Sequence, residues 1–384
     1  MQPFSIDVSD TVLDDLRDRL ARTRLLPDSP RKPPSGMSAA YLRDLVDSWR
    51  VFDWRSREDW LNRHPQFVSE IGDASIHFVH ARAERDDAPA LLVMHGWPHL
   101  FSLQLDFADL LPDFHVVVPS FPGFAFSAPY ADGPLTERRL ADTMHALMTD
   151  VLGYDRYLTY GEDFSANVND LIAASHPESV AGIVVTHSHF PSNEEREALT
   201  DPVERAFFDR LAAAHGSDGA YGHVQATRPD TLAAALNDSP AGLLAWIAEK
   251  LVEWSDTPSD DPAAVERRIG RERILTEATI YWVTESIASS FRSYYEGADQ
   301  PDPMPPVEVP AVVYIQRHEA DNPESIARGY YRDLRTFERL EEGGHFTVAE
   351  VPYAMADRTR AFARELGLLP DAAPPTAAGT GGLR

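Results

Sequence analysis

The stretch "YGEDFSANV", residues 160–168, marks the point where a strand passes into a helix. An apolar run at 157–159 precedes it, and a helical pattern follows it. The acidic pair Glu162 and Asp163 therefore falls on the turn between the two elements, where a carboxylate is partly desolvated and lies beside backbone N–H groups. Such a carboxylate either caps the helix or takes part in chemistry, and this segment alone leaves both interpretations open.

Length and composition indicate a large soluble globular protein. The chain has 384 residues, 43% of them hydrophobic, which is enough to bury a full core. Its formal net charge of −26 argues against nucleic acid or an anionic membrane surface as a partner. Cysteine is absent, which excludes disulfides, thiolate metal sites and a thiol nucleophile. Because no apolar run approaches the ~20 residues that span a bilayer and the N-terminus has no targeting pattern, we expect a cytoplasmic protein.

Strand-like and helical segments alternate along most of the chain. The predicted strands are short runs rich in β-branched and apolar residues, at 75–82, 90–96, 115–120, 156–161, 182–187 and 311–316. Most are separated by helical patterns, such as the one at 135–153, where apolar residues recur at helical spacing. This alternation predicts an α/β fold, with a mostly parallel sheet flanked by helices on both faces.

The chain is expected to contain five segments. Residues 1–70, rich in charge and aromatics, predict a helical arm packed on the outside of the domain. The α/β core is divided into 71–189 and 301–369, because the strand signal disappears between these two parts. Residues 190–300 are dominated by helix-forming stretches and predict an α-helical cap. The tail, 370–384, has almost nothing to bury and is expected to be disordered.

The turn at 161–165 fits a nucleophile elbow, in which the central residue of G-x-Nuc-x-G is exposed on a tight turn at the carboxyl end of the sheet. Gly161 opens the motif and Asp163 takes the central position. The fifth position is Ser165 instead of glycine, which reduces backbone freedom but keeps a small side chain. Asp163 is therefore the candidate nucleophile.

Two further loops supply candidate groups at the same end of the sheet. "HGWP", 95–98, follows a strong strand, and its glycine lets the backbone turn so that N–H groups face the top of the sheet. The N–H groups of Trp97 and of Phe164, the residue after the nucleophile, could together form an oxyanion hole. Near the C-terminus, His345 follows two glycines on a loop, which gives a general base the freedom to reach across the sheet.

A carboxylate that orients the histidine is expected between the nucleophile and His345, because α/β-hydrolases use that order. Glu319 and Asp321 both follow the strand at 311–316, and either could orient the imidazole. No G-x-S-x-G occurs, so a serine esterase or peptidase would lack its nucleophile. A carboxylate nucleophile instead indicates displacement at a saturated carbon, giving an ester that is then hydrolysed. Epoxides and alkyl halides are the substrates that fit.

Taken together, these motifs resemble the microsomal-type epoxide hydrolases of the α/β-hydrolase superfamily. The resemblance covers nearly all of the chain and includes the segment 3–25, HGWP, the elbow, the stretches 221–254 and 281–296, and the "GGHF" loop. It implies Asp163 as nucleophile, His345 as base, and two tyrosines of the cap, which fall on Tyr221 and Tyr294. The interval from Glu319 to His345 also resembles the spacing in the family, which favours Glu319 as the acid.

The resemblance implies a hydrolase that converts a small-molecule epoxide into a vicinal diol through an aspartyl hydroxyalkyl ester, without metal or cofactor. Membrane-bound members of the family begin with an anchor that is missing here, so a soluble enzyme is expected. The elbow departs from the usual GGDWG, since this chain has GEDFS, and the sequence therefore leaves the substrate range open. It also leaves open the oligomeric state, a homodimer included, and the choice between detoxification and natural-product biosynthesis.

Two other functions share the predicted fold. A haloalkane dehalogenase has the same nucleophile but needs halide donors, often an Asn in the HGxP motif and a Trp after the nucleophile, where this chain has Trp97 and Phe164. A non-catalytic binding protein would not need to keep a nucleophile, a base, an acid and both tyrosines. His187 and His189 could indicate a metal site, but without an evident third ligand we interpret them as strand-end residues.

Overall fold

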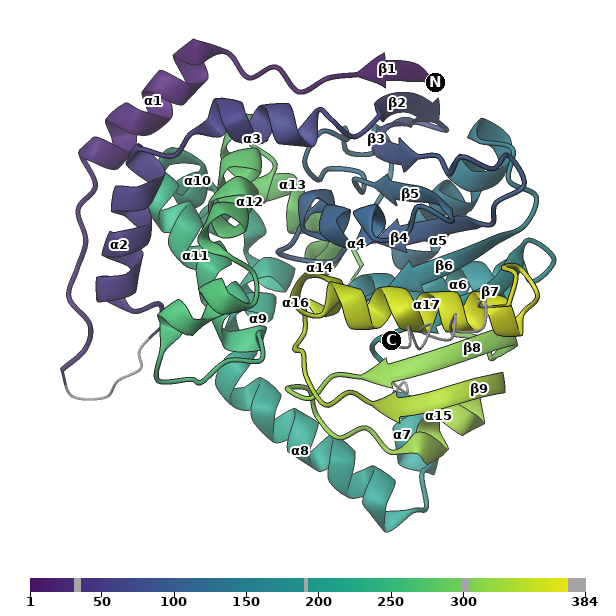
Figure 1. The fold of residues 1–384 in the computed structure, drawn as a ribbon. Coiled ribbons are helices and arrows are strands. Elements are labelled where there is room, and N and C mark those ends of the chain that lie inside the picture. The colour runs from purple at the N-terminus through teal and green to yellow at the C-terminus, as the bar shows by residue number, and fades with distance from the viewer. Residues whose placement is uncertain (31–35, 190–192, 298–303, 372–384) are drawn as a thin grey trace, which may run out of the picture.

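A nine-stranded mixed sheet forms the centre of the fold (Figure 1). The computed structural model describes residues 1–30, 36–189, 193–297 and 304–371. Across the sheet the strands run in the order β1-β2-β3-β5-β4-β6-β7-β8-β9. Their bounds are β1 Gln2–Phe4, β2 Gln66–Ile71, β3 Ala74–Ala81, β4 Ala90–Met94, β5 His115–Pro119, β6 Tyr157–Gly161, β7 Val180–Val185, β8 Val307–Ile315 and β9 Tyr331–Arg339.

All six predicted strands are present, as β3 to β8. The strands from β5 to β9 in the sheet order pair in parallel, whereas β1, β2 and β3 pair antiparallel. The predicted α/β fold with a mostly parallel sheet is therefore confirmed. In the register of β4 and β6, Met94 lies opposite Gly161. The segments that follow these strands, HGWP and the elbow, consequently leave the sheet side by side at its carboxyl edge.

Helices cover both faces of the sheet (Figure 1). α4 (Leu105–Asp109) and α17 (Pro352–Glu365) pack together on one face, and α5 (Glu137–Ala146) and α6 (Phe164–Ser175) pack together on the other. The strands β4 to β7 are buried along their whole length, as expected when both faces are covered. The shorter elements of the core are α15 Glu324–Tyr330, α16 Thr347–Glu350, the 3-10 helix η1 Phe101–Gln104 and the π-helix η2 Leu147–Val151.

The N-terminal segment differs from the helical arm predicted for 1–70. Its helices are α1 (Asp10–Ala21), α2 (Ala39–Arg50) and α3 (Trp54–Leu61), and α1 and α2 lie along α11 and α12 (Figure 1). The segment also contributes β1 and β2, so it extends the sheet, and the expectation of helices alone is wrong. The sequence concealed β2 because the polar residues Gln66 and Ser69 occupy buried positions of this strand, which obscures the alternation.

A long run of helices separates β7 from β8, in the segment for which a cap is predicted. These helices are α7 Asn193–Ala198, α8 Pro202–Asp218, α9 Ala220–Thr227, α10 Pro229–Asp238, α11 Pro240–Trp254, η3 Pro262–Arg267, α12 Arg271–Thr284, α13 Ile287–Ser290 and α14 Arg292–Tyr295. From residue 372 onward, the tail that we expect to be disordered lies outside the described residues. Within the described ranges, no helix combines the length and the apolar character needed to cross a membrane.

Candidate active site

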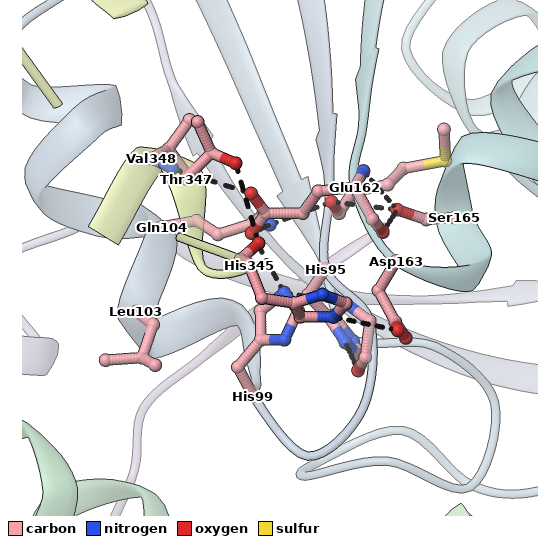
Figure 2. A network of polar contacts seen from close by, with 12 residues as sticks. His95, His99, Leu103, Gln104, Glu162, Asp163, Ser165, His345, Thr347 and Val348 are labelled. Carbon is pink, nitrogen blue, oxygen red and sulfur yellow. Dashed lines mark hydrogen bonds and ion pairs between the residues drawn. The ribbon is translucent and has the colours of Figure 1, made fainter. Parts of the chain in front are cut away.

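The elbow holds Asp163 in a tight turn between β6 and α6 (Figure 2). Its φ of 56° and ψ of −141° are uncommon for a residue with a side chain and cost about 1–3 kcal/mol. The turn requires glycine at 161, because a Cβ there would lie 2.4 Å from the Ser165 carbonyl oxygen. Asp163 stands at the N-cap position of α6, but its side chain makes no N-cap hydrogen bond and instead faces the N–H groups of Trp97 and Phe164, which argues against the alternative interpretation as a helix cap.

Ser165, which departs from the G-x-Nuc-x-G pattern, contributes to this turn. Its hydroxyl accepts a hydrogen bond from the Glu162 N–H at 3.0 Å and donates to the Glu162 carbonyl at 2.6 Å. The side chain is fully buried beneath the elbow. A serine at this position therefore closes the turn with its own hydrogen bonds, in place of the freedom that a glycine would give.

The two backbone N–H groups predicted for an oxyanion hole face the Asp163 carboxylate. The Trp97 N–H donates to Asp163 Oδ1 at 2.9 Å, and the Phe164 N–H is a second hydrogen-bond donor to this carboxylate. The loop can approach so closely only because residue 96 is glycine: a Cβ at Gly96 would lie 2.4 Å from the Asp163 Cβ. The two N–H groups thus mark the place where negative charge is stabilised.

His345 lies between two carboxylates. Its Nε2 is 3.0 Å from Asp163 Oδ2, and its Nδ1 is 2.8 Å from Glu319 Oε1. Asp321, the other candidate acid, has a side chain that is 81% exposed and pairs with Arg339. The structure therefore places Glu319, and not Asp321, beside the imidazole.

The two carboxylates make His345 strongly basic. Burial lowers the pKa of His345, but the hydrogen bonds and charges of Asp163 and Glu319 outweigh it and raise the pKa to about 10. Burial likewise raises the pKa of both carboxyl groups, and their hydrogen bonds reverse the shift, so that the pKa of Asp163 is lowered and the pKa of Glu319 lies well below its ordinary value. Near neutral pH the site therefore holds an imidazolium between two carboxylates.

His187 also belongs to this site. Its interpretation as a strand-end residue without a place in the site is therefore wrong. Its Nδ1 accepts a hydrogen bond from the Asp163 N–H at 3.2 Å, which leaves the proton on Nε2, 3.7 Å from Glu319 Oε1. One ligand atom from each of His187, Glu319 and His345 lies within 4.8 Å of the others, a donor set that could hold a divalent metal. A metal there would replace the hydrogen bond between His345 and Glu319.

The two tyrosines assigned by resemblance lie together, with ring centres 5.9 Å apart. Tyr221 lies on α9 and Tyr294 on α14, and their hydroxyls are hydrogen-bonded to each other. Burial raises the pKa of both hydroxyls above the ordinary value, so both stay protonated and can donate. The neighbouring Tyr295 is 49% exposed, which distinguishes it from Tyr294.

Aromatic rings hold these tyrosines and the histidine in place. The Trp97 ring stacks on Tyr221, with ring centres 5.4 Å apart, and meets Tyr294 edge-on at 5.9 Å. Trp254, at the end of α11, contacts Tyr221 at 5.0 Å and His345 at 4.9 Å, and its carbonyl accepts the His345 N–H at 2.9 Å. No sequence pattern points to Trp254, because its contacts depend on how α11 packs over the sheet.

A cavity of about 270 Å³ opens between the tyrosines and the carboxylate. Its walls are formed by apolar and aromatic side chains with a few polar groups. The lining residues are Leu135, Thr136, Glu137, Leu140, Asp163, Phe164, Tyr221, Ser293 and Tyr294. The cavity thus brings the Asp163 carboxylate and two tyrosines to one space.

Fold and site together define an α/β-hydrolase with an aspartate at the nucleophile position. The family model described as "alpha/beta hydrolase fold" matches residues 89–350, and the model described as "Epoxide hydrolase N terminus" matches residues 1–103. The chain belongs to the epoxide hydrolase family, as the sequence predicts.

Individual relatives agree with this assignment. The chain is 30% identical to epoxide hydrolase 1 of Oryctolagus cuniculus over 93% of its own length and 87% of the relative. It is 29% identical to epoxide hydrolase 1 of Sus scrofa, over 96% and 89%. The crystal structure of juvenile hormone epoxide hydrolase from the silkworm Bombyx mori superposes with a TM-score of 0.85 at 26% identity, covering 95% of this chain and 94% of that one.

Proposed function

We propose that Asp163 opens the epoxide as a covalent nucleophile and that His345 then directs water to hydrolyse the resulting ester, which yields a vicinal diol. The observation that carries this proposal is the chain of hydrogen bonds from Asp163 through His345 to Glu319, beside a cavity that Asp163 shares with the tyrosine pair. A nucleophile, a base and two hydroxyls that can donate hydrogen bonds to the epoxide oxygen are thereby present around one cavity. The reaction class agrees with the family to which the chain belongs.

In the first half-reaction, Asp163 attacks one carbon of the epoxide ring while Tyr221 and Tyr294 hold the ring oxygen. Burial keeps both hydroxyls protonated, and both tyrosines line the same cavity as the Asp163 carboxylate, so they can donate to a ring oxygen bound there. Hydrogen bonds to the developing alkoxide, with proton transfer, are typically worth ~10² to 10⁴ in rate. The product of this step is a hydroxyalkyl ester of Asp163.

The proton required by the alkoxide is already present in the site. Before the reaction, His345 carries a proton that both neighbouring carboxylates stabilise. Once Asp163 becomes an uncharged ester, one of these two charges is lost and the imidazolium becomes more acidic. The imidazolium proton is then transferred to the alkoxide through solvent or the tyrosine hydroxyls, which leaves His345 neutral. Ester formation therefore converts the imidazole into the form that can act as a base.

In the second half-reaction, neutral His345 takes a proton from water as the oxygen attacks the ester carbonyl of Asp163. The N–H groups of Trp97 and Phe164 stabilise the tetrahedral oxyanion, at roughly 3 kcal/mol for each donor in comparable sites. Collapse releases the diol and restores the pair of carboxylate and imidazolium. Glu319 keeps Nδ1 of the imidazole protonated and oriented throughout, a role supported by the 2.8 Å contact.

The helices between β7 and β8 act in this proposal as a cap over the nucleophile. Three of them supply groups at the cavity or the base: Tyr221 from α9, Trp254 from α11 and Tyr294 from α14. The substrate must enter between the cap and the sheet. The cavity volume of about 270 Å³ favours a compact epoxide, and the acidic Glu137 and Asp163 in its lining disfavour an anionic one, so styrene oxide is a suitable probe.

Isotope labelling tests the covalent step. In a single turnover of styrene oxide in ¹⁸O-water, the oxygen added to the first diol should be ¹⁶O from Asp163, and the label should enter the enzyme. Asp163→Ala should fold and form no diol. Asp321→Asn, in the loop after β8 that also carries Glu319, should behave as wild type because this side chain is exposed. Direct appearance of ¹⁸O in the first diol would show that water attacks the epoxide itself.

A further inference from the structure

Glu162 stands next to the proposed nucleophile, is fully buried, and has no part in the two half-reactions. The side chains of the two adjacent acids point in different directions (Figure 2). Asp163 turns toward His345, whereas Glu162 turns toward Gln104 and Val348. A buried carboxylate is costly unless it is well paired, so its partners indicate why it is present.

Four groups from four different segments surround the Glu162 carboxylate. Two of the contacts are short: the Tyr160 hydroxyl donates at 2.7 Å, and His99 Nε2 lies at 2.9 Å. Two are longer, from Gln104 Nε2 at 3.4 Å and the Val348 N–H at 3.5 Å. Burial raises the pKa of Glu162, but the neighbouring His99 and the Tyr160 hydroxyl outweigh it and lower the pKa. The group is therefore ionised and accepts from Tyr160, Gln104 and Val348. It also lies against His99, whose Nε2 accepts the Gly96 N–H at 2.9 Å and so ties the carboxylate to the loop of Trp97.

Two of these groups belong to the segments that carry the proposed catalytic groups. His99 follows Trp97 in the loop after β4, and Val348 follows His345 at the start of α16. Glu162 itself precedes the nucleophile. One carboxylate thus connects the turn of the nucleophile, the loop of the oxyanion hole and the loop of the base, at the point where all three meet.

We propose that Glu162 is a positioning residue, which fixes the loops of Trp97 and His345 relative to the elbow and thereby sets the rate of ester hydrolysis. The inference rests on the proposed aspartyl-ester mechanism. The two half-reactions should depend on Glu162 unequally. Ring opening uses the tyrosines of α9 and α14, which Glu162 does not contact. Ester hydrolysis uses the base and the oxyanion hole, both of which it holds.

Rapid-quench single turnovers with styrene oxide, followed by intact-protein mass spectrometry, separate formation of the ester from its decay. For Glu162→Ala the decay rate per molecule of ester should fall roughly 10- to 100-fold, the effect of a small misplacement of catalytic groups. Ester formation should change much less, so ester should accumulate. Glu162→Gln keeps the size and one acceptor oxygen, and it should recover part of the decay rate.

Substitution of His99 provides a second, independent test. If Glu162 positions the oxyanion-hole loop through His99, then His99→Ala should slow ester decay in the wild-type background and add little in the Glu162→Ala background. Asp170→Ala is the matched control, because Asp170 is a buried carboxyl group on α6 that accepts from the Tyr331 hydroxyl and contacts none of the three segments. It should lower the melting temperature without changing ester decay.

The outcomes distinguish this inference from the proposed function. A lower melting temperature with unchanged ester decay in Glu162→Ala would overturn it, as would effects of Glu162→Ala and His99→Ala that simply add. Should Glu162→Ala fail to fold, Glu162→Gln decides the question, and a wild-type decay rate in that variant overturns the inference. Absence of any ester in the wild-type enzyme would instead overturn the covalent mechanism itself.

Discussion

Glu319→Gln should slow hydrolysis of the ester while leaving its formation nearly intact. The Glu319 carboxylate lies 2.8 Å from Nδ1 of His345, a charge-assisted contact that the neutral amide weakens. Hydrogen bonds to charged groups contribute about 1.5–3 kcal/mol, and each ~1.4 kcal/mol is tenfold in rate, which gives about 10- to 100-fold slower hydrolysis. Since 29% of the Glu319 side chain is exposed, water replaces part of the lost interaction and favours the lower half of this range.

Stopped-flow tryptophan fluorescence can follow the ester, because Trp254 lies 4.9 Å from the His345 ring and Trp97 donates its N–H to the nucleophile. Intact-protein mass spectrometry at steady state gives the fraction of ester directly. Asp321→Asn is the matched control, since this side chain is 81% exposed and does not contact His345. Accumulation of ester in Asp321→Asn, with normal turnover in Glu319→Gln, would refute the assignment of the acid.

Three further predictions follow from the site. Tyr221→Phe and Tyr294→Phe should each slow ester formation about 10²-fold, because one of two donors to the alkoxide is lost, and the double variant should nearly abolish it in a single-turnover assay. Gly96→Ala should cost stability and activity together, since its Cβ would lie 2.4 Å from the nucleophile, whereas Gly329→Ala, with open space around it in α15, should not lower the melting temperature. The pKa of His345 is raised from 6.5 to about 10, so the stability that protonated His345 contributes is complete below pH 6.5 and is lost as the pH rises through 10. The difference in unfolding free energy between wild type and His345→Gln, measured by urea titration, should therefore shrink between these two pH values.

Local patterns predicted the elbow, because its requirements are local. A strand, a glycine that avoids the Ser165 carbonyl, a central acid and a helix follow one another within a few residues of Gly161. The strands β4 to β7 were predictable for a similar reason, since burial on both faces demands continuous apolar runs. By contrast, β2 places polar Gln66 and Ser69 inward, and no rule of alternation reveals it.

The site residues that the sequence does not predict are those whose roles depend on contacts between distant segments. His187 reaches the Asp163 N–H because β7 pairs with β6, and that pairing becomes visible only once the order of strands is known. Trp254 reaches His345 through the packing of α11 over the sheet. The choice of Glu319 over Asp321 rested on spacing and resemblance, and only the structure shows one beside the imidazole and the other in solvent.

The acidic pair at the elbow illustrates how position, more than residue type, decides the chemistry of a carboxylate. Glu162 and Asp163 both have a lowered pKa, and both are ionised. Asp163 opens onto the cavity, and its partners are two backbone N–H groups and an imidazole that can give up its proton. Glu162 is enclosed by Tyr160, His99, Gln104 and Val348 and cannot meet a substrate. The two side chains leave the strained turn at Asp163 in different directions, so in our proposal the same turn supplies both the nucleophile and the carboxylate that positions the loops of Trp97 and His345.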